Sequence, residues 1–374
     1  MGLQSIVDKS EFNKFLQCGA LLQLSPNQFR LIWGPFKPTP FDLVASLDEK
    51  TIIYCPQFWD FLYPTKSINS AYRGIKEVDL SNEQLLQVLN ADENLQKNLN
   101  SEVEWQPPDE LEFYNQFKWS QEKFRSNQLR KSVPIMLQKG QWTYSTLKLA
   151  NALSLLIQGQ HFGYTFGFWQ GREGFLGHSP ELIADWKSQD LVLNTVALAG
   201  TTTAGYYGKQ QIMQDSKILQ EHQIVIEDLK SILTGIDSNK KLTISETKVL
   251  ELKYLNHLQT SISVKNVEPN QVLNYIEKIH PTAALGLYPR DNNMYQELSE
   301  FEIQKQRQNF AAPFCFASKD AVKAIACIRQ FKFSENEIYL YSGCGVTAAS
   351  ILLSELSELE AKRNSVKKMM GLNS

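Results

Sequence analysis

Two kinds of hydrophobic pattern alternate along the chain, and they predict a mixture of long helices and short strands. Between residues 210 and 236 the apolar positions recur at helical spacing and lie near one side of a single long helix. These positions are Ile218, Leu219, Ile224, Val225, Leu229 and Ile232. A second helix is predicted to close the chain, from about residue 349 to residue 370.

Short aromatic and β-branched runs, separated by glycine and proline, predict the strands. Runs of this kind occupy 20–36, 51–63, 129–138, 161–186 and 190–201. The last three are expected to form a meander. Two further runs, 321–333 and 337–347, are predicted to form a hairpin around the turn at 334–337.

Between these groups, residues 65–128 form the most polar stretch, and 81–99 within it has helical periodicity. No linker rich in glycine, serine or proline divides the chain. Strand runs interrupted by long helices, without regular strand–helix alternation, are typical of α+β proteins with large sheets. We therefore expect an α+β fold in which large antiparallel sheets are flanked by helices, as one unit over residues 1–374.

Composition and charge narrow the possible partners. The 38 basic and 40 acidic residues give a net charge of −2, so there is no electrostatic reason to expect nucleic acid or a membrane surface. Five cysteines without C-x-x-C spacing fit a reducing compartment, and the five histidines lack zinc-binding spacing. Neither a secretory signal nor an apolar run of about 18 residues is visible. We expect a cytoplasmic protein that holds any anionic ligand with local positive groups.

Acidic residues on the two long helices are candidates for a metal site. Glu355, Glu358 and Lys362 fall within roughly 60° of one another on the closing helix. Glu221 and His222 are adjacent on the other helix. Carboxylates from separate helices suit Mg²⁺, with ligand oxygens and water completing its octahedron. By itself the pattern favours a solvated helix face over a metal site.

A glycine-containing turn and an arginine are candidates for holding an anion. Gly343 and Gly345 follow a predicted strand, where glycine lets the backbone approach a ligand and present N–H groups to it. Arg329, near the end of the preceding predicted strand, has the planar fork that grips a carboxylate. A turn that needs glycine for its own geometry is the alternative.

Lys131 and Glu181 form a candidate base and acid. Lys131 opens an apolar run, where partial desolvation would favour its neutral form. Glu181 follows Ser179-Pro180 in an apolar setting, which favours a protonated carboxyl. Each residue alone is also typical of a partly buried structural charge.

Seven motifs in one order resemble those of the chorismate-utilising enzymes, which include isochorismate, salicylate, anthranilate and aminodeoxychorismate synthases. The region of resemblance is 131–372, and residues 1–128 carry no motif of the family. The motifs are HSPELIADW, ALAGTTTAG, D-x-K-x-x-x-EH, HPTAALGLYP, AIACIR, SGCGV and E-x-x-E-x-x-x-K.

The resemblance implies a layered α/β/β/α fold and a Mg²⁺-dependent site for chorismate, a dianion. It implies that Glu221 and Glu358 bind the metal, with Glu355 binding directly or through water. Lys362 would lie near the ring carboxylate. The enolpyruvyl carboxylate would be held by Arg329 and the amides around Gly343 and Gly345, and Thr201 and His280 would line the pocket.

Several positions resemble the water-using branch of the family, in which Lys131 would activate water for attack at C2 and Glu181 would protonate the departing C4 hydroxyl. Ala199 stands where aminodeoxychorismate synthases usually carry a nucleophilic lysine. Leu285 and Phe310 match the residues that isochorismate synthases carry at these positions, so the resemblance favours isochorismate synthase activity. We expect that activity to serve a menaquinone or siderophore route. The protein is then expected to have no glutaminase subunit and to be a monomer or weak dimer. Salicylate synthase remains an alternative.

Other positions depart from the family pattern. Ile218 replaces an acid that usually follows the lysine of the D-x-K motif, which would remove a carboxylate from the surroundings of the metal. Ala312 and Cys315 replace glycines, Cys344 replaces an alanine, and 202–204 lacks the usual arginine. A divergent chorismate-binding protein with weak or no turnover is therefore a second alternative.

Overall fold

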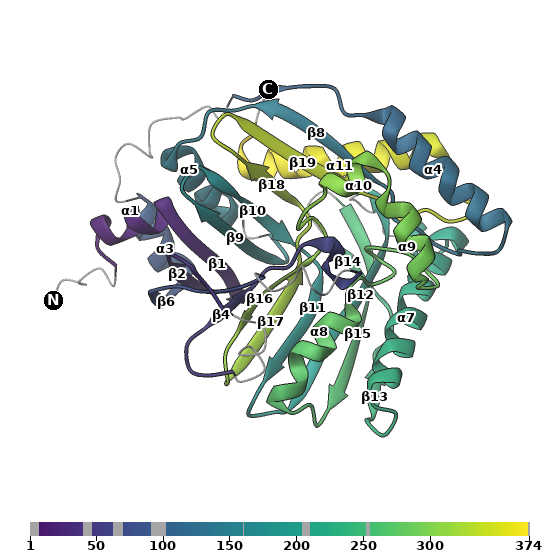
Figure 1. Cartoon of the computed structure of the whole chain (residues 1–374), viewed down its shortest axis with the longest axis horizontal. Helices are drawn as coiled ribbons and strands as arrows, with labels where there is room; N and C mark the ends of the chain where they lie inside the picture. Colours follow the sequence, from purple (N-terminus) through teal and green to yellow (C-terminus); the bar gives the residue numbers. More distant parts are fainter. Residues whose placement is uncertain are drawn as a thin grey trace.

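Two large antiparallel sheets form the centre of the protein (Figure 1). The computed structural model of the chain describes residues 7–39, 47–62, 70–90, 102–159, 161–203, 210–251 and 255–372. Within these residues nine strands form the first sheet. In spatial order they are β6 (Lys76–Ser81), β2 (Gln28–Trp33), β1 (Cys18–Ser25), β9 (Tyr164–Gln170), β10 (Glu173–Ser179), β18 (Gln330–Phe333), β19 (Glu337–Gly343), β8 (Ile135–Gln141) and β7 (Glu104–Trp105).

The second sheet has ten strands within the described residues. Its order is β13 (Leu242–Ile244), β15 (Leu255–Lys265), β12 (Val192–Thr203), β11 (Leu182–Lys187), β17 (Ala321–Ala326), β16 (Pro313–Ala317), β4 (Ile52–Tyr54), β5 (Ala71–Arg73) and β3 (Lys37–Pro38), with β14 (Lys248–Glu251) also paired to β15.

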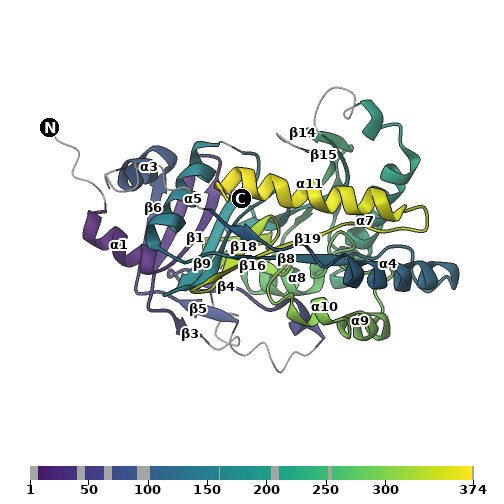
Figure 2. The same cartoon turned by 90° about the horizontal axis from the view of Figure 1, so that it is seen from above.

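Helices cover the outer face of each sheet, as the view from above also shows (Figure 2). The α-helices are α1 (Lys9–Gln17), α3 (Asn82–Asn90), α4 (Glu110–Arg125), α5 (Thr146–Gln158), α7 (Ser216–Ile236), α8 (Val272–Ile279), α9 (Asn292–Ser299), α10 (Glu302–Gln306) and α11 (Leu352–Met370). Two short 3₁₀ turns are η1 (Phe58–Phe61) and η3 (Pro269–Gln271).

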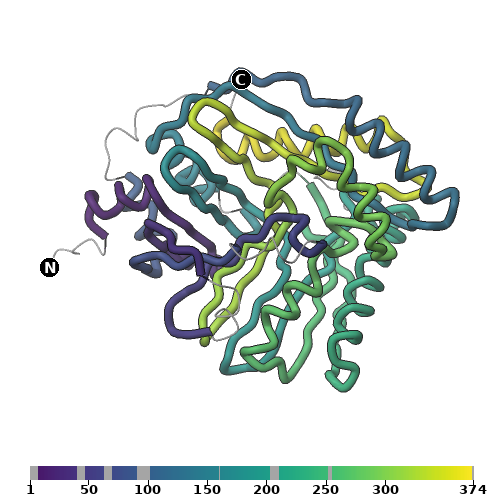
Figure 3. Tube along the Cα trace, in the orientation of Figure 1, coloured from purple at the N-terminus to yellow at the C-terminus, as the bar shows by residue number. Residues whose placement is uncertain are grey.

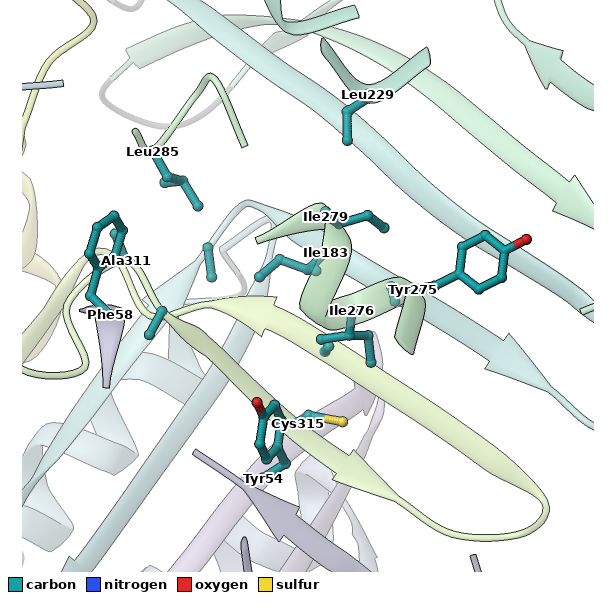
Figure 4. Close-up of a cluster of buried hydrophobic side chains, with 14 of the residues drawn as sticks. Tyr54, Phe58, Ile183, Leu229, Tyr275, Ile276, Ile279, Leu285, Ala311 and Cys315 are labelled. Atoms are coloured by element: carbon teal, nitrogen blue, oxygen red, sulfur yellow. The ribbon is translucent and has the colours of Figure 1, made fainter. Parts of the chain in front are cut away.

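Three buried clusters hold the layers together. On the first sheet, α1, α3, α5 and α11 pack over side chains such as Trp169 and Leu340. Between the sheets, Phe166 of β9 packs with Phe314 of β16. On the second sheet, α7 and α8 pack over its outer face, where Figure 4 shows Ile276 and Ile279 of α8 beside Ile183. Each fully buried large apolar side chain contributes about 1.5–3 kcal/mol, so these clusters are the main source of stability. The expected α+β class with layered helices and large antiparallel sheets is confirmed.

The long helix predicted over 210–236 begins later than expected, at Ser216. The side chain of Asp215 accepts hydrogen bonds from the backbone N–H groups of Lys217 (2.9 Å) and Ile218 (3.1 Å), which makes Asp215 the N-cap. An N-cap satisfies amide groups that have no partner inside a helix. Because the helix begins at Ser216, both Lys217 and Glu221 lie in its first turns. Four residues apart, they share one face of α7.

The run 321–333 is not one strand of a hairpin, because it crosses from one sheet to the other. Its first part, β17, pairs with β11 and β16 in the second sheet, and its last part, β18, pairs with β10 and β19 in the first. The crossing lies at 327–329, and Arg329 within it has a φ of 52°. Figure 3 traces the path of the chain between the elements. Non-glycine residues seldom adopt positive φ, so this corner fixes Arg329 in an uncommon conformation. The hairpin itself is formed by β18 and β19.

The remaining expectations have mixed outcomes. The predicted meander is split, since β9 and β10 pair in the first sheet while β11 joins the second. The polar helix predicted over 81–99 exists as α3 over Asn82–Asn90, and 91–99 lies outside the described residues. No helix in the described part of the chain is both long and apolar enough to cross a membrane. That residues 1–374 form one unit stays a prediction.

Candidate active site

A pocket of about 760 Å³, including its opening, is lined by residues of both sheets, of α7 and of α11. Eight of the eleven residues predicted for the site lie on its wall: Glu181, Thr201, Glu221, Arg329, Gly343, Gly345, Glu358 and Lys362. Lys131, Glu355 and His280 do not lie on this wall. The sheets bring together positions that are far apart in the sequence.

Lys131 lies just behind the wall and is fully buried. Its Nζ donates a hydrogen bond to the carbonyl oxygen of Ala283 at 2.7 Å and lies 3.4 Å from Oε1 of Glu221. Burial raises the pKa of Glu221, although the Lys131 ammonium opposes this shift. The lysine and the carboxylate therefore form a coupled pair at the edge of the pocket.

Gly345 leaves the space in which the Lys131 and Glu221 side chains meet. A Cβ at Gly345 would overlap Oε1 of Glu221 and would lie 2.8 Å from Nζ of Lys131. Gly343 is less restricted, since its Cβ would lie 3.3 Å from side-chain atoms of Val133 and Ile135. The absence of a side chain at Gly345 therefore makes room for the two charged groups.

Each of the three predicted metal-binding carboxylates is paired with its own lysine. Besides the pair formed by Lys131 and Glu221, Lys217 Nζ lies 2.6 Å from Oε1 of the buried Glu355, and Lys362 Nζ lies 2.6 Å from Oε1 of Glu358. Lys362 also donates to the carbonyl oxygen of Gly343 at 2.8 Å. Glu355 is held by Lys217 and is not presented to the pocket.

The chemistry of these carboxylates suits a hard cation, because Mg²⁺ is commonly held by one or two carboxylates together with ligand oxygens and water. Glu221 and Glu358 meet this requirement, as both line the pocket. Within the described part of the chain, no group of three or more His, Cys, Asp or Glu side chains lies close enough to hold a metal ion. The two-carboxylate arrangement fits Mg²⁺, whereas the predicted set of three is not assembled around one point.

The pocket also contains a positively charged region around Arg329. Its guanidinium donates to Ser365 Oγ at 3.0 Å and lies 3.3 Å from Nε2 of His257, whose Nδ1 lies 3.2 Å from Oγ1 of Thr201. Burial, with Arg329 nearby, holds the pKa of His257 well below its usual value, so this imidazole is neutral near pH 7. Burial lowers the pKa of Arg329 to about 10, which leaves the guanidinium charged.

Glu181 is a buried carboxyl on the wall, with 4% of its surface exposed. Burial raises its pKa to about 7, against the opposing effects of the nearby Lys131 and Lys362 side chains. The protonated form of Glu181 is therefore populated near neutral pH, which is the condition for a general acid.

His280 packs away from the pocket. Its ring makes edge-on contacts with Phe58 and Phe61, and its Nε2 lies 3.1 Å from the carbonyl oxygen of Phe58. Burial lowers the pKa of His280 to about 3. The ring is a neutral part of an aromatic cluster, whereas the resemblance had implied that it lines the pocket.

Arg307, His257 and Tyr341 also line the pocket, and the sequence pattern did not single them out. Arg307 is fully buried, its guanidinium stacks 3.3 Å from the ring centroid of Phe58, and its Nη2 has no hydrogen-bond partner among the described residues. Its polar neighbours in the sequence gave no indication of burial. His257 lies in a long strand with no neighbouring motif.

Ile218, the residue that replaces a family acid, is part of a small apolar cluster with Ile212 and Leu258. It packs against Gly200, whose φ is +77° and whose added Cβ would lie 2.6 Å from Cγ2 of Ile218. The isoleucine therefore fills a space beside the pocket, and it supplies no carboxylate there.

Curated proteins of several activities are similar to this chain. Isochorismate synthase MenF of Bacillus subtilis (strain 168) is 27% identical over 224 residues, which cover 58% of this chain and 46% of that protein. The vibriobactin-specific isochorismate synthase of Vibrio cholerae is 26% identical over 238 residues, 62% of this chain and 59% of that protein. Anthranilate synthase component 1 of Neisseria meningitidis is 23% identical over 240 residues, 63% of this chain and 48% of that protein. The chain thus spans about half the length of the curated relatives it matches.

Among solved structures, the menaquinone-specific isochorismate synthase MenF of Escherichia coli superposes with a TM-score of 0.74 at 17% identity. The superposition covers 99% of this chain and 93% of that one, and it shows that the two share a fold. The family model described as chorismate binding enzyme matches residues 62–371, which is most of the chain. This protein therefore belongs to the family of chorismate-binding enzymes.

Proposed function

We propose that the chain converts chorismate to isochorismate in this pocket. The observation that carries the proposal is that Lys131 and Glu181 are both buried at this one pocket, and that burial raises the pKa of the Glu181 carboxyl to about 7. The similarity to isochorismate synthases supports the same assignment. Menaquinone or siderophore synthesis is the proposed route.

Chorismate carries two carboxylates, and the pocket offers positive groups for both. We assign the enolpyruvyl carboxylate to Arg329, whose guanidinium has no carboxylate partner among the described residues. The ring carboxylate lies near Lys362. A fork-shaped guanidinium in a water-poor site binds a carboxylate more strongly than it would in water.

Mg²⁺ is the proposed cation, held by Glu221 and Glu358, with Glu355 binding directly or through water after it separates from Lys217. When bound, the ion neutralises charge on the ring carboxylate. The protein residues do the proton transfers. Lys131, in its neutral form, takes a proton from water as the water oxygen bonds to C2, and both ring double bonds shift. Glu181 donates a proton to the hydroxyl that leaves C4 as water. One water enters and one leaves, so no further reactant is needed.

A second candidate is a protein that binds chorismate without efficient turnover. Two observations favour it: Ile218 supplies no carboxylate beside the pocket, and each proposed metal ligand is paired with a lysine. Salicylate formation is a further outcome of the same assay. The predictions of a monomer or weak dimer and of no glutaminase subunit stay as proposals.

The test is a product assay on the wild-type chain and on Lys131→Ala. Purified protein is incubated with chorismate and Mg²⁺, and the products are separated by chromatography. We expect isochorismate from the wild type, and loss of turnover with retained chorismate binding, measured by calorimetry, in Lys131→Ala. Lys118→Ala, an exposed lysine on α4, is the matched control.

Folded wild-type protein that binds chorismate but forms no product would replace the proposal by the binding-protein alternative. Salicylate with pyruvate would assign a lyase-coupled reaction. Product that requires ammonium would assign an ammonia-using synthase.

A further inference from the structure

A second and larger cavity lies between the two sheets, about 1700 Å³ including its opening. One row of side chains crosses five neighbouring strands of the first sheet and faces this space. The register pairs Phe168 with Phe175, Phe175 with Lys332, Lys332 with Tyr339, and Tyr339 with Lys139. Residues paired across strands project from the same face of a sheet. The row therefore places two lysines among three aromatic rings in one wall.

Polar groups without partners gather at this cavity. Lys332 has no hydrogen bond or ion pair in the described part of the chain, and burial lowers the pKa of its ammonium to about 8. Asn309, with 3% of its surface exposed, lines the cavity, and its Nδ2 has no partner. Buried polar groups are usually satisfied, so the unpaired amide of Asn309 and the unpaired ammonium of Lys332 on one wall favour a polar ligand.

The charge and shape of the wall identify the class of ligand. Lys139, Lys305 and Lys332 line the cavity, and Glu173 is the one acidic residue among its lining residues. Lys305 already has an ion-pair partner, because its Nζ lies 3.3 Å from Glu300. The half-buried Lys332 and the exposed Lys139 are therefore the lysines that can meet an anion. The aromatic rings beside them favour a flat apolar body. We propose that this cavity is a binding site for a small aromatic carboxylate, separate from the candidate active site.

The two cavities share one side chain. Tyr341 lines both, its ring stacks on Phe310 at 5.3 Å, and its hydroxyl donates to the carbonyl oxygen of Gln306. Phe168, Phe175 and Tyr339 line only the second cavity, as do Lys139, Lys332 and Asn309. The proposal does not rest on the proposed function, because it uses no residue of the acid–base pair.

Benzoate is the probe, titrated into the full-length chain by calorimetry. We expect saturable binding of one benzoate at about millimolar concentration, weakened at least tenfold by Lys332→Met. The exposed Lys118→Met should bind as the wild type does, and Lys332→Arg should restore binding because it keeps the charge. Arg329→Met, which removes a carboxylate-binding group of the other pocket, should leave the binding step that depends on Lys332 in place. Thermal melting confirms that each variant is folded.

Absence of saturable binding overturns the proposal, and so does binding that folded Lys332→Met retains. Binding lost in Arg329→Met but kept in Lys332→Met would place the benzoate in the first pocket, which also overturns it. Acetate that binds as tightly as benzoate would remove the aromatic part of the assignment. Because these measurements follow binding of benzoate, their failure is distinct from failure of the chorismate assay.

Discussion

Replacing Gly345 by alanine tests whether the turn after β19 is shaped by the two charged groups behind it. An added Cβ would overlap Oε1 of Glu221 and lie 2.8 Å from Nζ of Lys131. Real Cβ atoms essentially never approach another heavy atom within 3.0 Å, so one group must move. Lys131 is held at 2.7 Å by the carbonyl oxygen of Ala283, so the Glu221 carboxylate is the group expected to turn away.

The cost follows from this displacement. If Glu221 moves by about 1 Å, it loses its 3.4 Å contact with Lys131 and its position on the wall. Misplacement of a positioning group by about 1 Å costs on the order of 100-fold in rate, which corresponds to about 2.7 kcal/mol of activation free energy. The atoms that must move are the ends of flexible side chains, so the free energy of unfolding should fall by less than about 1 kcal/mol.

The assay compares Gly345→Ala with Gly343→Ala, whose added Cβ would lie 3.3 Å from its nearest neighbours. We expect kcat/KM for chorismate to fall about 100-fold in the first variant and to stay within about threefold in the second. Urea denaturation separates loss of rate from loss of folded protein. Equal activity in the two alanine variants would refute the steric argument, and so would a Gly345→Ala rate close to that of the wild type.

Three further predictions concern the same charged groups. Burial raises the pKa of Glu181 to about 7, and only its protonated form can act as the acid. The rate, measured as a function of pH, should therefore fall as pH rises through about 7, and Glu181→Gln should abolish activity at every pH. Asp228→Asn should lower the free energy of unfolding, measured by urea denaturation, by about 3 kcal/mol. The buried Asp228 carboxylate accepts hydrogen bonds from Arg290 and from the backbone amide of Ala283, and the carbonyl of Ala283 in turn binds Lys131. An unchanged midpoint of the urea unfolding curve would contradict this prediction. Lys217→Met should tighten Mg²⁺ binding by about tenfold in calorimetry, about 1.4 kcal/mol, because the ammonium competes for Glu355; weaker binding would show that Lys217 supports the metal instead.

The sequence predicted the layers better than the path of the chain. Helical periodicity is local, so α7 and α11 could be predicted, and only their first residues were misplaced. The run 321–333 reads as one strand because both halves have the same alternating pattern. Its crossing between the sheets depends on the positive φ of Arg329, which no apolar periodicity marks. That corner also places Arg329 in the pocket, so the missed feature of the fold has a role in the site.

The charge pairs explain which site residues could be foreseen. Spacing along one helix reveals the pair formed by Lys362 and Glu358, four residues apart. It cannot reveal that Lys217, 138 residues before Glu355 in the sequence, binds that carboxylate in the fold. Glu355 was therefore predicted as a metal ligand beside Glu358, whereas in the structure a lysine occupies its carboxylate. Similarly, Arg307 lies in a polar segment and only the fold shows that it is buried.

These contacts give the pocket two electrostatically different ends. At one end every carboxylate already has an ammonium partner, so a cation that binds there must displace or share lysines. At the other end Arg329 and Arg307 have no carboxylate partner among the described residues, and both are desolvated. A buried charge without a counterion is costly, and an anion that enters this end removes that cost. The arrangement favours anion binding at the arginine end before the lysines release their carboxylates.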